Sequence, residues 1–194
     1  MSLLDIYLLG APILRQETTP VDAITDELRG LIDDMFETMY AAKGIGLAAP
    51  QVGRSERLTV IDVDDRQLVL VNPEIALREG MARAEEGCLS IPDIYGDVDR
   101  ATRVVVRALD REGQPFELDT ATVPGSRDAQ ELLARCIQHE TDHLDGKLFI
   151  DYLSLVKQQA AQRKWKKLRK GDRSLTRSVV PAAVSQHHHR DEEL

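Results

Sequence analysis

Residues 139–143 read His-Glu-Thr-Asp-His and lie in a stretch whose apolar residues recur at helical spacing. On an α-helix, residues four apart are separated by about 40° of rotation and about 6 Å of rise. His139 and His143 can therefore reach one metal ion from the same face, and Glu140 can serve a water at that metal as general base. The motif predicts hydrolysis at a metal site. A helix with two hydrogen-bonded, partly exposed histidines is the alternative, because the motif is short.

A catalytic metal site usually needs a third protein ligand beside an open position. A peptidase of the metzincin type would place a third histidine soon after the helix, but Asp145-Gly146-Lys147 continues without one. The carboxylates beyond residue 150, where a thermolysin-like enzyme would have its glutamate, lie in a basic segment or in the tail. The third ligand is therefore expected upstream.

Two cysteines are candidates for that ligand. Cys88 lies within residues 85–92, a segment with Gly before it and Pro after it that we expect to be irregular and to connect two strands. Cys136 lies one helical turn before His139, where a buried, small apolar role is more typical. Two cysteines in 194 residues do not indicate a disulfide scaffold. We expect reduced thiols, because a Cys88–Cys136 bridge, the alternative, would remove a thiolate ligand.

The bulk properties indicate a globular protein. A length of 194 residues suits one compact domain with a tail, and 42% apolar with 30% charged residues is ordinary. No apolar run approaches the roughly 18 residues of a membrane span. Residues 1–5 lack the basic start of a secretory signal, and no Arg- and Ser-rich transit segment follows. We expect a bacterial cytoplasmic location, or an organellar one if a transit segment has been removed.

The elements that must position these residues can be read from hydrophobic periodicity. Helices are predicted at about 25–42, with Thr25 as N-cap, at 128–143 and at 151–170. Strands are predicted at 58–63, 68–71, 101–109 and 116–123. Residues 44–53 form a loop of small residues that backbone or ligand can approach closely. Helices segregated from consecutive strands indicate an α+β fold, with one domain over 1–173 and a disordered polar tail over 174–194.

The last predicted helix belongs to a strongly basic segment. Residues 157–173 carry eight Lys and Arg side chains against Asp172 alone, whereas the whole chain has a net charge of −8. A basic segment on an acidic body indicates an anionic partner for that segment. The alternative is a solvated amphipathic helix, in which Leu153 and Trp165 pack and the cations face water.

Three separated motifs carry further information. They are Gly-Ile-Gly-Leu-Ala-Ala-Pro-Gln at 44–51, Glu-Gly-Cys-Leu-Ser at 86–90 and Gln-His-Glu-Thr-Asp-His-Leu at 138–144. In this order, in a chain of this length, they resemble the peptide deformylases. The resemblance covers about residues 5–170 and includes Leu-Phe-Ile-Asp-Tyr-Leu at 148–153, which leads into a C-terminal helix.

The resemblance implies roles for individual residues. The metal ligands would be Cys88, His139 and His143. Glu140 would be the general acid and base, and Gln51 with the backbone N–H of Leu89 would form the oxyanion hole.

The resemblance also implies substrate contacts. Gly46 would bind the peptide backbone, and the pocket for the methionine side chain would be lined by Ile45, Glu86, Leu132, Arg135 and Cys136. Many members have a branched aliphatic residue where this chain has Arg135, so that its aliphatic stem would form the contact. Beneath the site, Asp142 would pair with Arg100; a solvated Arg100 is the alternative.

The implied activity is metal-dependent hydrolysis of the N-formyl group from the N-terminal formyl-methionine of newly made polypeptides, with release of formate. The implied fold has antiparallel sheets around a central metal-binding helix, followed by a C-terminal helix. One divalent metal ion is expected, in the first place Fe2+, with Ni2+, Co2+ or Zn2+ able to replace it. A thiolate ligand suits the softer first-row ions.

The expected partners are formyl-methionyl nascent peptides and, through the basic helix, the ribosome; neither DNA nor a membrane is expected. Two other functions are the alternatives. A metallo-endopeptidase would use the same helix motif but lacks a convincing third ligand downstream. A non-catalytic, ribosome-associated metal-binding module would have no need of Glu140 and Gln51.

Overall fold

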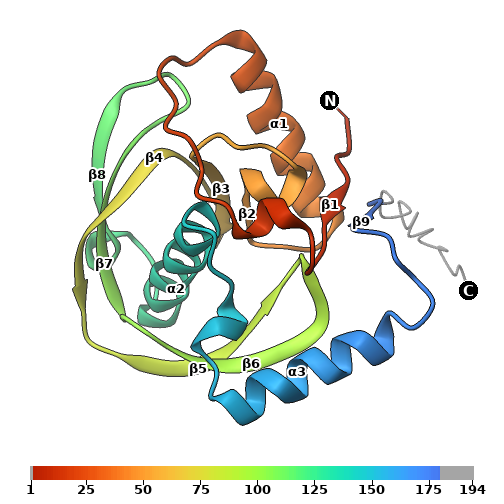
Figure 1. The fold of residues 1–194 in the computed structure, drawn as a ribbon. Helices are drawn as coiled ribbons and strands as arrows, with labels where there is room; N and C mark the ends of the chain where they lie inside the picture. The colour runs from red at the N-terminus through yellow and green to blue at the C-terminus, as the bar shows by residue number, and fades with distance from the viewer. Residues whose placement is uncertain (1, 180–194) are drawn as a thin grey trace, which may run out of the picture.

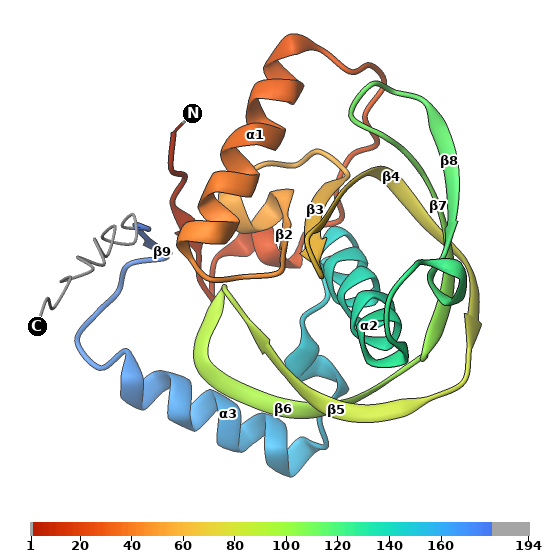
Figure 2. The same cartoon turned by 180° about the vertical axis from the view of Figure 1, so that it is seen from behind.

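The computed structural model describes residues 2–179. Helix α2 (Arg127–Leu144) lies at the centre, the strands wrap around it, and helices α1 and α3 lie on the outside (Figures 1 and 2). All strand pairs are antiparallel, which confirms the predicted α+β class. None of the helices in the described part of the chain is long and apolar enough to cross a membrane.

The largest sheet has five strands in the order β2-β3-β4-β7-β8. The strands are β2 (Gly46–Ala48), β3 (Leu58–Val63), β4 (Arg66–Glu79), β7 (Arg103–Leu109) and β8 (Pro115–Asp119). The β3–β4 turn consists of Asp64 and Asp65, which both have positive φ, as a two-residue hairpin requires. One face of the sheet buries Val104 and Val106 against α2.

Helix α1 (Asp26–Ala41) covers β2 and β3. Thr25 caps it as predicted, because its hydroxyl accepts the Leu28 N–H at 3.2 Å. The buried face of the helix includes Met35, which packs in one cluster with Leu47 and Leu58. This packing holds β2 in place, and β2 forms one wall of the site described below.

Helix α2 begins at the Ser126 cap and agrees with the predicted helix within one residue at each end. Leu133 and Ile137 pack against the sheet. The residues from Gln138 to His143 are all buried although all of them are polar. Burying six polar side chains in succession is costly unless each finds a partner, so this stretch is a strong indication of a functional site.

A second, two-stranded sheet is formed by β5 (Ala82–Cys88) and β6 (Ile91–Arg100). The prediction that residues 85–92 are irregular was therefore wrong: only Leu89 and Ser90 lie between the two strands. The β5 sequence is polar and poor in β-formers, and it is extended because it pairs with β6.

Helix α3 (Leu155–Leu168) packs against the outside of β6, as Figures 1 and 2 show. It begins later than predicted, because Phe149–Tyr152 forms a 3₁₀ turn and Ser154 caps the helix. Further 3₁₀ turns lie at Pro12–Arg15, Ala49–Val52 and Thr120–Thr122.

The chain returns after α3 to its beginning. Strand β9 (Thr176–Arg177) pairs with β1 (Ile6–Tyr7), which lies next to it in Figure 1. The disordered tail was predicted to begin at residue 174, but β9 lies within its first residues. Residues 180–194, the rest of that predicted tail, lie outside the described residues.

Candidate metal centre and active site

The three predicted metal ligands meet in space. Cys88 ends β5, whereas His139 and His143 lie on α2, and one ligand atom from each falls within 4.8 Å of the others. The Cys88 sulfur is 3.3 Å from Nε2 of His143. The two imidazole rings stand edge to face, with centroids 5.0 Å apart.

These side chains suit a divalent metal ion. Burial lowers the pKa of His143 well below its usual value, so that its imidazole is neutral and can donate a lone pair. Burial also acts to lower the pKa of His139, but its hydrogen bonds with Cys88 and Glu86 outweigh this and raise that pKa. Nδ1 of His143 and Oε2 of Glu140 are buried without a hydrogen-bond partner in the described part of the chain. One thiolate with two imidazoles is a donor set for zinc or another first-row transition metal.

Glu86 supports the first imidazole. Its Oε2 accepts the Nδ1–H of His139 at 3.0 Å, which leaves Nε2 of the ring for a metal. The Arg100 guanidinium donates to both carboxylate oxygens of Glu86, at 2.9 and 3.0 Å. Burial alone would raise the pKa of Glu86, but the hydrogen bonds from His139 and Arg100 outweigh it and lower the pKa to about 2.

Arg100 also supports the helix turn that carries His143. Its Nη1 donates to Oδ2 of Asp142 at 2.5 Å, so the predicted pair is confirmed and the solvated alternative is wrong. Tyr152 donates to the other Asp142 oxygen at 2.9 Å and lies under the guanidinium, 4.6 Å from ring centroid to Cζ. No sequence pattern indicates this role of Tyr152, because only the fold brings the 3₁₀ helix after α2 back to Arg100.

Glu140 faces β2 across the site. Burial raises the pKa of this carboxyl to about 7. A Cβ atom on Gly46 would overlap the Glu140 carboxylate and lie 2.8 Å from the Cys136 sulfur. Glycine at this position therefore lets β2 come this close to α2, as predicted for these small residues. The prediction of a loop over residues 44–53 was wrong, because they include β2 and the 3₁₀ helix Ala49–Val52.

Cys136 lies beside the metal group but is not part of it. Both cysteines are free, and Cys136 is buried, as predicted. Its sulfur is 3.6 Å from the carbonyl oxygen of Ile45, and burial raises the pKa of its thiol.

Gln51 is held in one orientation. Its Oε1 accepts the backbone N–H of Ala48 at 2.8 Å, so its NH2 group is directed toward the Cys88 sulfur at 3.5 Å and the Ser90 hydroxyl at 3.3 Å. Leu89 lies between Cys88 and Ser90 in the turn of the hairpin. The sequence analysis missed Ser90 as a partner of Gln51, although its position in the second motif could have indicated it.

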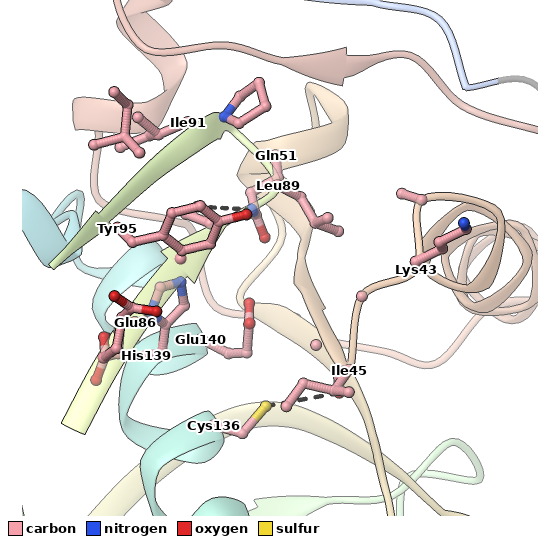
Figure 3. Close-up of a pocket in the computed structure, with 18 of the residues that line it drawn as sticks. Lys43, Ile45, Gln51, Glu86, Leu89, Ile91, Tyr95, Cys136, His139 and Glu140 are labelled. Carbon is pink, nitrogen blue, oxygen red and sulfur yellow. Dashed lines mark hydrogen bonds and ion pairs between the residues drawn. The ribbon is translucent and has the colours of Figure 1, made fainter. Parts of the chain in front are cut away.

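A cavity of about 500 Å³ opens beside these groups. Figure 3 shows Glu86, Cys136, His139 and Glu140 along one side of it and Lys43 with Ile45 on the facing loop. Its lining includes all the predicted substrate-contact residues: Ile45, Gly46, Glu86, Leu132, Arg135 and Cys136. Lys43 and Tyr95 also line it, and sequence reasoning missed both because they belong to no motif.

A thiolate and two imidazoles next to a buried carboxylate, in the wall of a ligand-sized cavity, define a metal-binding hydrolase. The chain matches the family model described as polypeptide deformylase over residues 3–159. It is 52% identical over 172 residues to the peptide deformylase of Alkalilimnicola ehrlichii, and the aligned region covers 87% of this chain and 92% of that relative. The chain belongs to the polypeptide deformylase family, which confirms the resemblance drawn from its motifs.

Solved structures agree with this assignment. A peptide deformylase from Legionella pneumophila is 47% identical and superposes with a TM-score of 0.78. The superposed region covers 87% of this chain and 96% of the Legionella chain. A peptide deformylase from Synechococcus elongatus in complex with actinonin is 46% identical, covers 83% and 85% of the two chains, and has a TM-score of 0.74. This protein is accordingly an amidohydrolase of the deformylase class.

Proposed function

We propose that Cys88, His139 and His143 hold one divalent metal ion, Fe2+ in the cell, and that the site uses it to remove the N-formyl group from formyl-methionyl nascent peptides. The observation that carries this proposal is the convergence of a thiolate and two imidazoles beside Glu140 in one cavity. A bound metal ion would polarise the formyl carbonyl and make water acidic enough to attack near neutral pH. The remaining steps depend on groups of the protein.

Glu140 moves the proton. Its Oε2 is buried without a partner among the described residues, so the carboxylate is available to an entering water. In this proposal Glu140 takes one proton from the attacking water as the new C–O bond forms. It returns that proton to the peptide nitrogen as the C–N bond breaks, which releases formate and a free amino terminus.

Gln51 and Leu89 stabilise the negative charge that develops on the formyl oxygen, because each donates a hydrogen bond to it in this proposal. The Gln51 NH2 group is fixed in place because its carbonyl oxygen is engaged by Ala48. A donor that is positioned before the reaction costs no reorganisation, and one such donor typically contributes about 3 kcal/mol to lowering the barrier. The backbone N–H of Leu89 is the second donor in this proposal.

The methionine side chain would occupy the apolar part of the cavity. Ile45 and Leu132 line the cavity and are 44% and 43% exposed, which places them where it is open to solvent. Together with Cys136 they form an apolar wall that the unbranched methionine side chain could contact. Gly46 has no side chain, so the peptide backbone could lie against it. Glu86 and Arg135 would contribute only their stems, because their charged ends bind each other.

We further propose that α3 docks on ribosomal RNA and that the protein acts in the cytoplasm. Arg163, Lys166 and Lys167 of α3, and Lys170 just after it, have no ion pair within residues 2–179. All four of these cations are exposed. An exposed basic surface of this kind suits a phosphate backbone.

Formate release tests the main proposal. Protein reconstituted anaerobically with Fe2+ should release formate from a formyl-methionyl peptide. Glu140→Ala should lower the rate by about 10²–10⁴-fold, the usual contribution of a general acid–base group, with metal content retained. Normal turnover by that variant would contradict the role of Glu140. Cleavage inside an unformylated peptide would instead favour the endopeptidase alternative.

A further inference from the structure

The metal site takes its ligands from two separate elements. Cys88 belongs to the β5–β6 hairpin, whereas His139 and His143 belong to α2. In the described part of the chain, the backbone of α2 packs mainly on the five-stranded sheet and on two 3₁₀ helices, and much less on the hairpin. The hairpin instead packs its apolar residues Ile94 and Val98 on the segment after α2. The relative position of the two ligand-bearing elements therefore depends on side chains that cross between them.

Arg135 is such a side chain. It extends from α2 and donates from Nη2 to the carbonyl oxygen of Ala82 on β5, at 2.7 Å. Its Nη1 donates to the carbonyl oxygen of Val98 on β6, at 2.9 Å, and to Oε1 of Glu86, at 2.8 Å. The guanidinium thus binds both strands of the hairpin, and its side chain is only 12% exposed.

The contact with Glu86 connects Arg135 to the metal ligands. Glu86 precedes Cys88 by two residues on β5, and the pairing with β6 is irregular between Gly87 and Cys88. Both side chains nevertheless reach α2, because Oε2 of Glu86 lies 3.0 Å from Nδ1 of His139 and the Cys88 sulfur lies 3.3 Å from Nε2 of His143. The carboxylate of Glu86 accepts from His139 at the same time. Arg135 therefore helps to fix both the strand that ends in Cys88 and the group that orients His139.

We propose that Arg135 is a positioning residue of the metal centre: by joining α2 to both strands of the β5–β6 hairpin, it sets the distance between the Cys88 thiolate and the two imidazoles. The residue touches neither metal nor reacting atoms. The inference rests on the proposed function, in which these three side chains are the ligands.

Arg100 makes a second connection, from β6 to Asp142, but it does not replace the first. Arg100 reaches α2 through one carboxylate near its C-terminal end. Arg135 lies two turns earlier and binds backbone carbonyls, which cannot change rotamer to follow a displaced partner. Without Arg135, the side-chain contacts that remain include Arg100 with Asp142, Glu86 with His139, and Gln138 with the backbone of Ala101 just after β6. None of these binds the backbone of β5, so this strand and the Cys88 sulfur at its end can shift relative to α2.

Metal binding tests this role without recourse to turnover. Arg135→Met keeps the length of the stem in the cavity wall and removes the three donated hydrogen bonds. Apoprotein would be titrated anaerobically with Co2+ against a chromophoric chelator. The thiolate-to-cobalt absorption band would report the Cys88 ligand separately. We expect the dissociation constant for Co2+ to rise by about 10- to 100-fold, as is usual when a group that orients a ligand is lost, with a weaker or shifted band.

Two further variants make the result interpretable. Arg83→Met is the matched control, because Arg83 pairs with Asp99 across the same hairpin but on its exposed side; its Co2+ affinity should stay within about twofold. Arg135→Lys keeps the charge but has a single nitrogen in place of the guanidinium fork that reaches Ala82, Val98 and Glu86. Its affinity should be intermediate, and it remains informative if Arg135→Met does not fold.

The proposal is overturned if Arg135→Met binds Co2+ within about twofold of the wild type and with the same spectrum. It is equally overturned if the variant raises only KM for a formyl-methionyl peptide, since that would make Arg135 a wall of the substrate pocket and nothing more. Formate release by the wild type is measured in parallel. Its absence would contradict the proposed function, whereas the Co2+ comparison alone decides the role of Arg135.

Discussion

The two cysteines have opposite surroundings although both lie within the active site. The sulfur of Cys88 is close to a ring nitrogen of His143 and to the amide of Gln51, which are groups that accompany a thiolate ligand. Cys136 is buried next to Gly46 and the carbonyl oxygen of Ile45, where burial raises the pKa of its thiol. A thiol kept protonated in this way is a poor metal ligand.

This difference leads to a prediction for the two serine variants. Cys88→Ser replaces a thiolate by a neutral hydroxyl and should lower metal content after anaerobic reconstitution and dialysis at least tenfold. Cys136→Ser should retain the metal, because its hydroxyl can still donate to the carbonyl of Ile45. Metal analysis of both variants alongside the wild type checks this, and the opposite pattern would exchange the roles of the two cysteines.

The residues of the site could be predicted from the sequence to very different degrees. The spacing of His139 and His143 was sufficient to predict a shared metal, because helix geometry fixes it. Nothing in the spacing indicated Cys88, which reaches the site from another sheet. The search for a ligand upstream left two cysteines as candidates, and the resemblance then implied that the ligand is Cys88. The bridge from Arg135 to Ala82 and Val98 could not be predicted, because it binds backbone carbonyls, which leave no pattern in the sequence.

At the scale of elements, the helices were predicted well and the strands less well. Caps and periodicity defined α1 and α2 within one or two residues. Strand β4 was predicted at 68–71 but extends over Arg66–Glu79, because its second half pairs with β7 and is not apolar. The β5–β6 hairpin was missed for the same reason. Strands that are stabilised by pairing, with polar side chains in water, show weak periodicity in the sequence.

Strand β9 is the element whose contribution is simplest to test. The backbone N–H of Leu8 donates to the carbonyl oxygen of Leu175 at 2.8 Å, and Ser178 donates to Asp5 at 2.7 Å. A typical hydrogen bond contributes about 1 kcal/mol net, so these contacts and the β1–β9 pairing should contribute about 1–2 kcal/mol to the free energy of unfolding.

Truncation after Arg173, which removes β9, should therefore lower Tm by about 2–8 °C, given roughly 2–4 °C per kcal/mol for a chain of this size. Truncation after Val179 is the control, because it leaves every one of these contacts in place. Thermal unfolding of both apoproteins, followed by circular dichroism, measures the difference. Equal melting temperatures for the two truncations would show that β9 contributes nothing to stability.

For the whole molecule, the arrangement separates two surfaces. The cavity opens between the facing loop of Lys43 and Ile45 and the α2 side of the site, whereas α3 runs along the outside of β6 (Figures 1 and 3). Two lysines of α3 bind the hairpin beneath it: Lys157 pairs with Asp97 at 2.9 Å, and Lys164 donates to the carbonyl oxygen of Asp93 at 2.6 Å. The helix is thereby attached to the sheet that carries Cys88, while its other cations remain available to a partner.

The separation predicts that ribosome binding and hydrolysis can be altered independently. Neutralising Lys166, Lys167 and Lys170 to Gln should weaken binding to ribosomes about tenfold at low salt. Each phosphate contact contributes about 0.7–0.9 to the slope of log K against log salt, so the slope should fall by about 2. Hydrolysis of a short formyl-methionyl peptide should not change, because none of the three lines the cavity.

The matched control removes the same charge from another surface: Arg66→Gln, Arg78→Gln and Arg107→Gln, all on the five-stranded sheet. If attraction between the ribosome and the protein's overall charge were responsible, both triple variants would lose affinity equally, because each changes the net charge by three. A docking face on α3 requires that the sheet variant keep its affinity and its salt slope. Cosedimentation with ribosomes over a range of salt concentrations distinguishes the two, and equal losses would contradict docking through α3.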